Sequence, residues 1–356
     1  MEVLRQLSRR FDSALRVTLV NAEPHAPYSG MLPGLIAGHY SWPDCHINLV
    51  ALCRRAGARL VIGQVVGVDS KARSLLLDGM DPVPWDLLSL NTGSVPSLSS
   101  IEGAIRFAIP IKPMSGFLSA LQRMIETRER SPDRLMAVLV VGAGAGGVEV
   151  ALALRHRLGG SGGPSLHVTL AGEQLLHGYP QPVVRSVRRA LAKGRVDLME
   201  GPRATRVTDS SVLFSDGKEV PAHFTVWTTG ASAPKWIAAS GLATDACGFL
   251  AVDPFLRSRS DASVFAAGDV ASLEPPVAKA GVYAVREAPV LARNLLAAFH
   301  GTPLAPYVPQ SHFLSLISLG SRRAVASFGP VGFEGSLIWR LKDHIDRKFM
   351  RRYLSD

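Results

Sequence analysis

The strongest pattern in the chain is an uninterrupted apolar run, followed by glycines and then by apolar residues at helical spacing. Residues 136–141 read Met-Ala-Val-Leu-Val-Val, which is typical of a strand that is buried on both faces. Residues 148–158 predict a helix, and residues 166–171 predict a second strand. This order predicts a β-α-β unit, in which the two strands are parallel members of one sheet.

The residues on either side of this unit predict more structure of the same class. Strands are expected at 15–20, 59–62, 87–90 and 264–267, and helices at 115–130 and 281–300. Residues 24–48 are punctuated by proline and glycine and are expected to form a loop. The two halves predict an α/β protein with two Rossmann-like dinucleotide-binding domains, the second inserted in the first. The expected parts are a first domain at 1–113 and 230–300, a second domain at 114–229, and a C-terminal region at 301–356.

Composition narrows the class of protein. Of the 356 residues, 47% are apolar and 19% are charged, which suits a sizeable core and excludes a disordered chain. The net charge of +10 favours anionic partners, but the basic residues are dispersed and no nucleic-acid-binding motif accompanies them, so no nucleic acid partner is predicted. Cys45, Cys53 and Cys247 form no CxxC pair, which argues against a redox-active dithiol and a cysteine-based zinc site. No metal site is predicted.

Two stretches bear on the cellular location. The charged N-terminal segment 1–16 lacks the apolar core of a signal peptide. Residues 135–154 carry one charge, Glu149, but their glycines favour a strand, a turn and a helix over a membrane span. We therefore expect a cytoplasmic protein.

Gly142, Gly144 and Gly147 form a G-x-G-x-x-G pattern between the predicted strand and helix. The first glycine permits a tight turn, the second lets the backbone approach a pyrophosphate, and the third lets the helix pack closely on the strand. The helix N-terminus adds unpaired N–H groups and the positive end of its dipole. The pattern predicts a dinucleotide site; a tight glycine turn in another α/β protein is the alternative.

The end of the second strand bears on which dinucleotide is bound. An acidic residue usually ends this strand and binds the adenine ribose. Here the strand ends in Gly172, Glu173 follows one position later, and no arginine stands there to accept a 2′-phosphate. The sequence favours NADH and leaves NADPH open.

A second anchor follows the predicted strand at 264–267. The strand ends abruptly at Gly268-Asp269, which places a carboxylate beside a turn where it can accept hydrogen bonds from a polyol. A simple turn or a helix cap is the alternative. Together with the glycine pattern, this dipeptide becomes a more specific indication of a dinucleotide-cofactor site.

Taken together, these residues resemble the pyridine nucleotide–disulfide oxidoreductases, flavoproteins with two dinucleotide-binding domains. Within that family the chain resembles the branch without the disulfide, near type II NADH dehydrogenases. It is most similar to NADH dehydrogenase-like proteins related to the flavoprotein domain that is fused to selenide, water dikinase. The residues that carry the resemblance are 27–34, 91–94, 142–149, 227–231, 266–269, 279–286 and 339–352.

The resemblance implies that the first domain binds FAD, that the second binds NADH or NADPH, and that hydride passes from the nicotinamide to the flavin. It implies catalytic roles for Glu149 and Lys279, although Glu149 is equally compatible with an acid that complements the helix dipole. The cofactor-binding residues that it implies are Met31, Leu32, Pro33, Asn91, Thr92, Gly93, Gly142, Gly144, Gly147, Gly230, Gly268, Asp269, Ala280 and Gly281.

The electron acceptor is expected to be a diffusible small molecule such as a quinone, because the chain has no paired thiol to receive electrons from the flavin. Two alternatives stay open. One is a flavoprotein of selenium or sulfur metabolism, and the other is an NAD-binding module that has lost its flavin.

The two ends of the chain carry further expectations. The family's FAD domain opens with a strand and a glycine-rich loop, and residues 1–4 correspond to the helix after that loop, so we expect about twenty upstream residues to be missing. A genuine truncation is the alternative, and FAD binding by the 356 residues is in doubt in either case.

Near the other end, Leu337, Leu341, Ile345 and Phe349 recur at helical spacing among basic residues. This basic amphipathic helix either lies on an anionic membrane, which would place the protein on the inner face of the cell membrane, or packs on its own domain. The oligomeric state is not predicted.

Overall fold

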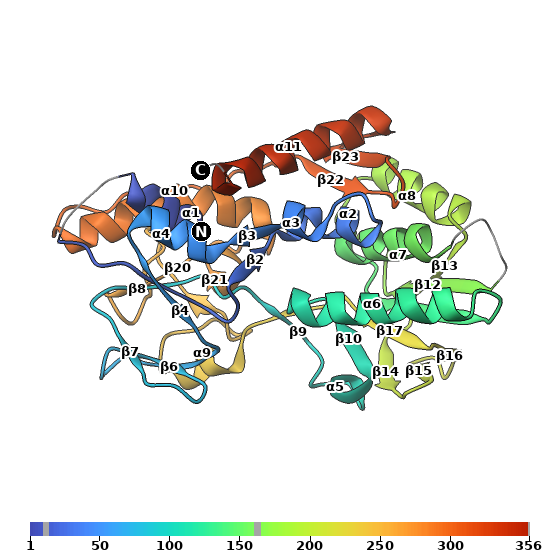
Figure 1. Cartoon of the computed structure of the whole chain (residues 1–356), viewed down its shortest axis with the longest axis horizontal. Helices are drawn as coiled ribbons and strands as arrows, with labels where there is room; N and C mark the ends of the chain where they lie inside the picture. The colour runs from blue at the N-terminus through green and yellow to red at the C-terminus, as the bar shows by residue number, and fades with distance from the viewer. Residues whose placement is uncertain (10–13, 160–164, 355–356) are drawn as a thin grey trace.

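The computed structural model describes residues 1–9, 14–159 and 165–354. Figure 1 shows two sheet-containing halves side by side, with the last helix, α11 (Ser336–Leu354), lying along one edge of the molecule above α3 (Trp42–Cys45) and a small C-terminal sheet. The glycine pattern lies in the half that is drawn in green. This arrangement agrees with the expected α/β class.

The green half is built on a five-stranded parallel sheet with the order β10-β17-β11-β12-β13. These strands are β10 (Ala108–Pro110), β17 (Phe224–Trp227), β11 (Met136–Val141), β12 (Leu166–Gly172) and β13 (Val196–Glu200). Val138 and Val140 of β11 face a core shared with α6 (Met114–Arg130), α7 (Ala145–Leu158) and α8 (Gln181–Lys193). The alternate residues Leu139 and Val141 face α5 (Ala104–Phe107) and an antiparallel sheet of β14 (Ala204–Val207), β15 (Ser211–Phe214) and β16 (Glu219–Pro221). The sheet is therefore covered on both faces, which is why β11 reads as a continuous apolar run.

The other half has shorter strands in separate sheets. Two parallel pairs, β1 (Thr18–Asn21) with β4 (Arg59–Ile62) and β8 (Leu88–Leu90) with β20 (Val264–Ala266), are not joined by any described strand. The described strands leave β1 and β20 with one sheet neighbour each. An antiparallel sheet of β5 (Val65–Asp69), β6 (Ser74–Leu77) and β7 (Val83–Pro84) lies beside them. The helices of this half are α1 (Glu2–Ser8), α4 (Leu49–Ala56), α9 (Lys235–Ala239) and α10 (Gly281–Phe299).

Smaller elements connect these parts. The remaining two-stranded sheets pair β2 (His25–Pro27) with β3 (His46–Asn48), β9 (Val95–Pro96) with β18 (Ala231–Ser232), and β19 (Leu250–Ala251) with β21 (Ala271–Ser272). The C-terminal sheet consists of β22 (Ser315–Ser318), β23 (Ala324–Phe328) and β24 (Val331–Gly335). Short helical turns occur at α2 (Leu32–Ile36), η1 (Ser29–Met31) and η2 (Gly268–Val270).

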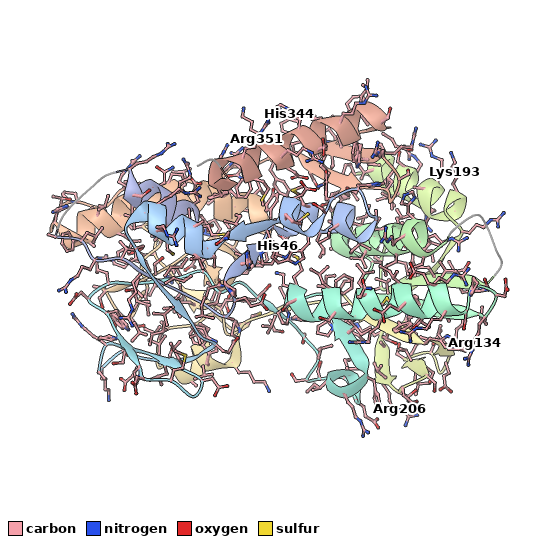
Figure 2. All side chains as sticks on the ribbon, in the orientation of Figure 1. His46, Arg134, Lys193, Arg206, His344 and Arg351 are labelled. Atoms are coloured by element: carbon pink, nitrogen blue, oxygen red, sulfur yellow. The ribbon has the colours of Figure 1, made fainter. Side chains whose placement is uncertain are left out.

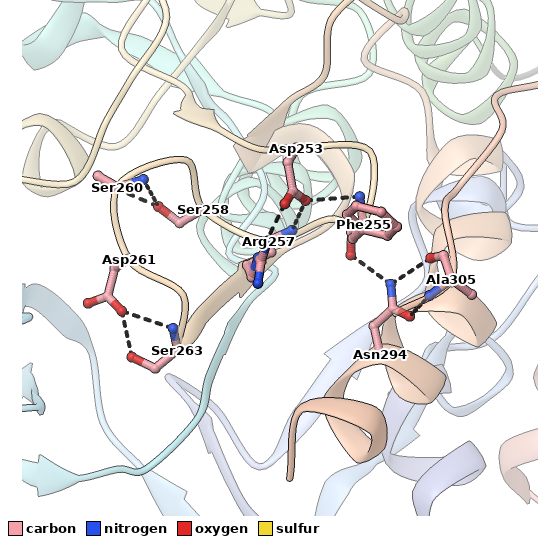
Figure 3. A network of polar contacts seen from close by, with 9 residues as sticks. All are labelled: Asp253, Phe255, Arg257, Ser258, Ser260, Asp261, Ser263, Asn294 and Ala305. Atoms are coloured by element: carbon pink, nitrogen blue, oxygen red, sulfur yellow. Dashed lines mark hydrogen bonds and ion pairs between the residues drawn. The ribbon is translucent and has the colours of Figure 1, made fainter. Parts of the chain in front are cut away.

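A buried polar network fixes the segment that leads into β20. Figure 3 shows Asn294 of α10 donating hydrogen bonds from Nδ2 to the carbonyls of Phe255 (2.8 Å) and Ala305 (2.9 Å) and accepting one from the Ala305 N–H (2.8 Å). Asp253 accepts hydrogen bonds from the backbone N–H groups of Phe255 (2.9 Å) and Arg257 (3.0 Å). Because Asn294 is fully buried and these bonds satisfy its amide, they anchor α10 to the loop that precedes β20.

Most predicted elements agree with the structure, and the differences have local causes. Residues 24–48 were expected to be a loop, but they contain short helices and two strands, each too short to show a period. The helix α4 was not predicted; Asn48 caps its start by accepting a hydrogen bond from the Ala51 N–H (3.0 Å), and Gly57 ends it in a left-handed conformation. Within the described residues, no helix combines the length and the apolar character that a membrane crossing requires.

Candidate active site

The glycine pattern forms the turn between β11 and the N-terminus of α7. Gly142 has a φ of +124°, a conformation that residues with a side chain rarely adopt. A Cβ on Gly147 would lie 1.7 Å from the carbonyl oxygen of Gly142, so only glycine lets α7 approach the turn this closely. A Cβ on Gly144 would meet no atom within 4 Å, so this glycine faces open space. The first and third glycines are thus required by packing, whereas the second leaves room for a ligand at the helix N-terminus.

Thr228, directly after the neighbouring strand β17, contacts this turn. Its hydroxyl lies 2.9 Å from the carbonyl oxygen of Val141 and 3.2 Å from that of Gly142. Gly230 follows two residues later, with a φ of +64°, at the point where the chain returns to the other half. These contacts hold the turn in place without occupying the space in front of Gly144.

Gly268 and Asp269 lie directly after β20, as the sequence predicted. Gly268 has a φ of +71°, and a Cβ there would lie 2.6 Å from Nδ2 of Asn91. The Asn91 amide donates a hydrogen bond to the carbonyl of Ala267 (2.5 Å). The predicted residues Asn91 and Gly268 are therefore in contact, although they are far apart in the sequence.

The carboxylate of Asp269 is held from one side. Its Oδ2 accepts hydrogen bonds from Nζ of Lys112 (3.1 Å) and from the hydroxyl of Ser94 (3.2 Å). No described residue donates a hydrogen bond to its Oδ1. Lys112 lies between β10 and α6 of the green half. Asp269 thus has a fixed orientation and a free acceptor atom.

The N-terminus of α10 lies near this carboxylate. Lys279 donates a hydrogen bond to the carbonyl of Ala271 (2.5 Å), and its ammonium lies 4.0 Å from the centre of the Phe249 ring. Burial lowers the pKa of Lys279, and carboxylates that include Asp245 and Asp269 oppose this effect. Ala280 caps α10, and a Cβ on Gly281 would meet nothing within 4 Å.

The remaining predicted residues differ in their surroundings. Gly93 has a φ of +74° and open space around it, and Thr92 precedes it in the same loop. Met31, Leu32 and Pro33 are buried, with Met31 and Leu32 in different hydrophobic clusters. A cavity of about 500 Å³ lies between residues 35–42, α6 and Arg157, and none of the predicted residues lines it.

Glu149 lies in α7, just after the glycine turn, and its side chain is partly buried. Its Oε1 accepts a hydrogen bond from the backbone N–H of Ser318 in β22 (2.8 Å). Burial raises the pKa of Glu149 from 4.5 to about 7, although Lys342 and the Ser318 N–H favour the charged form. Glu149 is therefore more than an exposed helix-capping acid: it titrates near neutrality where α7 meets the C-terminal sheet.

The sequence analysis did not identify the charged groups that accompany Glu149. Lys342 of α11 is buried and donates hydrogen bonds to Oδ2 of Asp346 and to the carbonyl of Gly30, both at 2.6 Å. Oδ1 of Asp346 accepts a hydrogen bond from the hydroxyl of Tyr28 (3.2 Å). The i, i+4 spacing of Lys342 and Asp346 was the available signal, but it is equally typical of an exposed helix pair.

The described residues fit a dinucleotide at the glycine turn. They also leave an acceptor for a polyol at Asp269, whose Oδ1 receives no hydrogen bond from a described residue, and a Cβ on Gly93 or Gly281 would meet no atom within 4 Å. They supply no second glycine-rich turn before β1 for a flavin pyrophosphate. The fit to FAD therefore covers its ribityl and ring portion.

Comparisons with known proteins find relatives over most of the chain. NADH dehydrogenase-like protein YutJ of Bacillus subtilis is 24% identical over 358 residues, covering 97% of this chain and 96% of YutJ. Type II NADH:quinone oxidoreductase Ndh of Mycobacterium tuberculosis is 27% identical over 326 residues, covering 82% of this chain and 69% of Ndh. The solved structure of NDH2 from Plasmodium falciparum in complex with NADH has the same fold, with a TM-score of 0.81 at 14% identity, covering 98% of this chain and 94% of that one.

The family itself follows from a match over most of the sequence. The model of the pyridine nucleotide-disulphide oxidoreductases matches residues 1–288. The match confirms the resemblance that the sequence motifs indicated, and the fold likeness confirms two Rossmann-like halves. The chain therefore belongs to the pyridine nucleotide-disulphide oxidoreductase family.

Proposed function

We propose that this protein uses FAD to transfer electrons from NADH to a quinone at a membrane surface. The observation that carries the proposal is a pair of turns, one that opens α7 and one that follows β20. One leaves open space at Gly144 for a dinucleotide, and the other presents the free Oδ1 of Asp269. Ndh, a relative over 82% of this chain, is a type II NADH:quinone oxidoreductase, which supports a quinone as the acceptor.

FAD, when bound, supplies the chemistry of two-electron transfer between a nicotinamide and a quinone. In this proposal Asp269 binds the ribityl chain, and Gly93, Ala280 and Gly281 lie beside the flavin ring. The remaining residues assigned to the cofactors are Met31, Leu32, Pro33, Asn91, Thr92, Gly142, Gly144, Gly147, Gly230 and Gly268. The FAD-binding part comprises residues 1–113 and 230–300, and the NADH-binding part comprises residues 114–229.

Glu149 supplies the acid–base chemistry in this proposal. A quinone takes up protons together with electrons, so a group that exchanges a proton near pH 7 is suited to the task. Glu149 has a pKa of about 7 because it is buried, and the buried ammonium of Lys342 favours its charged form. Lys279, at the start of α10, places a positive charge near the proposed flavin ring, where it favours the reduced, anionic form.

The outer face of α11 supports a membrane contact. Leu337, Leu341 and Ile345 are 72%, 43% and 41% exposed, so the described part of the chain does not cover this apolar stripe. His344 and Arg351 project from the same helix away from the protein (Figure 2). The opposite face packs inward through residues that include Lys342, Asp346, Met350 and Tyr353. An apolar stripe among basic groups is suited to an anionic lipid interface.

The function is tested by the visible spectrum and by NADH oxidation with a short-chain ubiquinone. We expect the purified protein to carry or take up FAD, to lose its absorbance near 450 nm when NADH is added, and to regain it when the quinone follows. A form extended upstream in frame is measured in parallel, because the described residues lack a turn for the FAD pyrophosphate. If neither form binds flavin, the proposal is wrong and an NAD-binding module without flavin is the better reading.

The membrane contact has its own test. Leu341→Asp should reduce sedimentation with vesicles that contain phosphatidylglycerol several-fold, because it places a charge in the apolar stripe. Leu76→Asp, at a comparably exposed leucine of β6 in the other half, is the matched control and should sediment like the wild type. Equal sedimentation of both variants would show that α11 is not the contact.

A further inference from the structure

The cavity between residues 35–42 and α6 takes no part in the proposed function. Its volume of about 500 Å³ lies within the range of pockets that bind small molecules. One wall is the segment 35–42, which leads from α2 into α3, and the other is α6 together with Arg157 near the end of α7 (Figure 1). A molecule in this cavity would therefore bridge segments that are far apart in the sequence.

The walls of the cavity include aliphatic side chains and one exposed aromatic ring. Leu118, Leu121 and Ile125 are spaced by three and four residues, which places them on one face of α6. Trp42 of α3 also lines the cavity and is 46% exposed. Its ring is stacked on that of His46, with 4.0 Å between the ring centres, and this stacking holds the indole in one orientation. The cavity therefore offers a ligand an apolar surface and a fixed aromatic ring.

The lining of the cavity carries a positive charge without a negative one. Among the described residues that line it, Arg157 alone has a permanent charge, and none is acidic. Its guanidinium forms no hydrogen bond or ion pair with another described residue. Gly38 has a φ of +79°, and a Cβ there would lie 2.5 Å from Nη1 of Arg157, so the glycine leaves room for the guanidinium at the cavity. The donors of this guanidinium are therefore available to an anion.

Neighbouring groups also favour an anion at this place. His39 lines the cavity, and its ring centre lies 5.1 Å from that of His156. Burial lowers the pKa of His39, a hydrogen bond with the Gly320 carbonyl opposes this effect, and the nearby His156 and Arg322 lower the pKa further. The surroundings that disfavour a positive charge on His39 stabilise a negative charge on a ligand.

We propose that this cavity binds an aromatic carboxylate. The guanidinium of Arg157 pairs with the carboxylate through two parallel hydrogen bonds, and the flat apolar body packs on the aliphatic face of α6 beside the ring of Trp42. The unpaired cation selects an anion, and the indole favours a flat body over a flexible one. Neither the glycine turn nor Asp269 lines the cavity, so this inference does not depend on the proposed function.

Titration calorimetry on the full chain tests this site with two probes, 2-naphthoate and the uncharged 2-naphthamide. The probes share one ring system and differ only in the charged group. Loss of one charge-assisted hydrogen bond corresponds to about a tenfold change in affinity. Naphthoate should therefore bind the wild type about tenfold more tightly than naphthamide. Arg157→Gln should weaken naphthoate binding about tenfold and leave naphthamide binding unchanged.

Three further variants show whether the probes bind in the cavity. Arg157→Lys keeps the charge but lacks the planar fork, so it should keep only part of the affinity for naphthoate. Leu118→Trp should weaken the binding of both probes, because the larger side chain fills the cavity. Arg123→Gln is the matched control, because Arg123 is an exposed residue of α6 that does not line the cavity. This variant should bind both probes like the wild type.

Equal affinities of the wild type for naphthoate and naphthamide would overturn the proposal without recourse to any variant. Failure of naphthoate to bind at millimolar concentration would overturn it as well. So would an Arg157→Gln variant that binds naphthoate like the wild type, or a Leu118→Trp variant with unchanged affinity for both probes. Equal urea midpoints of the wild type, Arg157→Gln and Arg123→Gln would show that a change in affinity does not come from unfolding.

Discussion

Replacing Glu149 by glutamine should change the pH dependence of stability in a specific direction. Glutamine keeps the size of the side chain and an oxygen that can accept the Ser318 N–H, but it cannot ionise. The wild-type carboxyl has a pKa of about 7 in the folded protein, raised from 4.5 by burial. Between these values the unfolded chain releases its proton while the folded protein retains it, so the wild type loses stability as the pH rises through this window.

The size of the effect follows from the shift in pKa. Each pKa unit corresponds to about 1.4 kcal/mol, so the full shift amounts to about 3 kcal/mol. At pH 5 the two proteins should differ little in the pH-dependent part of their stability. By pH 8, Glu149→Gln should have gained about 3 kcal/mol relative to the wild type. The gain should develop mainly between pH 5 and 7 and then level off.

Urea unfolding followed by tryptophan fluorescence at pH 5, 6, 7 and 8 measures this difference. Glu129→Gln, an exposed change on α6, reports any general effect of replacing a glutamate. A difference between the wild type and Glu149→Gln that stays constant from pH 5 to 8 would refute the reasoning, because it would mean that the buried carboxyl ionises without cost. In the same variant, the pH profile of the rate of quinone reduction should no longer show a group with a pKa near 7.

Two further changes test the packing of the site. Gly147→Ala should lower the free energy of unfolding by about 1–3 kcal/mol or more and weaken NADH binding at least tenfold, because its Cβ would lie 1.7 Å from the Gly142 oxygen. Gly146→Ala, in the next position and with nothing within 4 Å, should be neutral or slightly stabilising; equal urea midpoints and NADH affinities for the two variants would contradict this packing. Lys342→Met should cost about 3–5 kcal/mol in urea unfolding, because it leaves the buried carboxylate of Asp346 without its ammonium partner. A loss below about 1 kcal/mol would show that Asp346 finds another donor or takes up a proton.

The β-α-β unit, the glycine turn and the Gly268-Asp269 turn could be predicted from the sequence alone. Each is written in a short stretch of the chain: β11 is apolar throughout because both faces of its sheet are covered, Gly142 is required by its φ of +124°, and Gly147 is required by its contact with the Gly142 oxygen. Local patterns of this kind are visible in a single sequence because spacing along the chain fixes spacing in the structure. The resemblance to the pyridine nucleotide–disulfide oxidoreductases gave an expected fold for the rest of the chain.

Which charges far apart in the sequence meet follows from the packing of the chain. Arg203 reaches Glu173 from a different strand connection, Lys112 holds Asp269 from the segment between β10 and α6, and the Lys342–Asp346 pair of α11 is buried beside Gly30. No period in the sequence predicts these placements, because they depend on how the sheets and α11 pack. The same packing buries Glu149 and thereby moves its pKa toward neutrality, since the cost of desolvating a charge depends on everything that surrounds it.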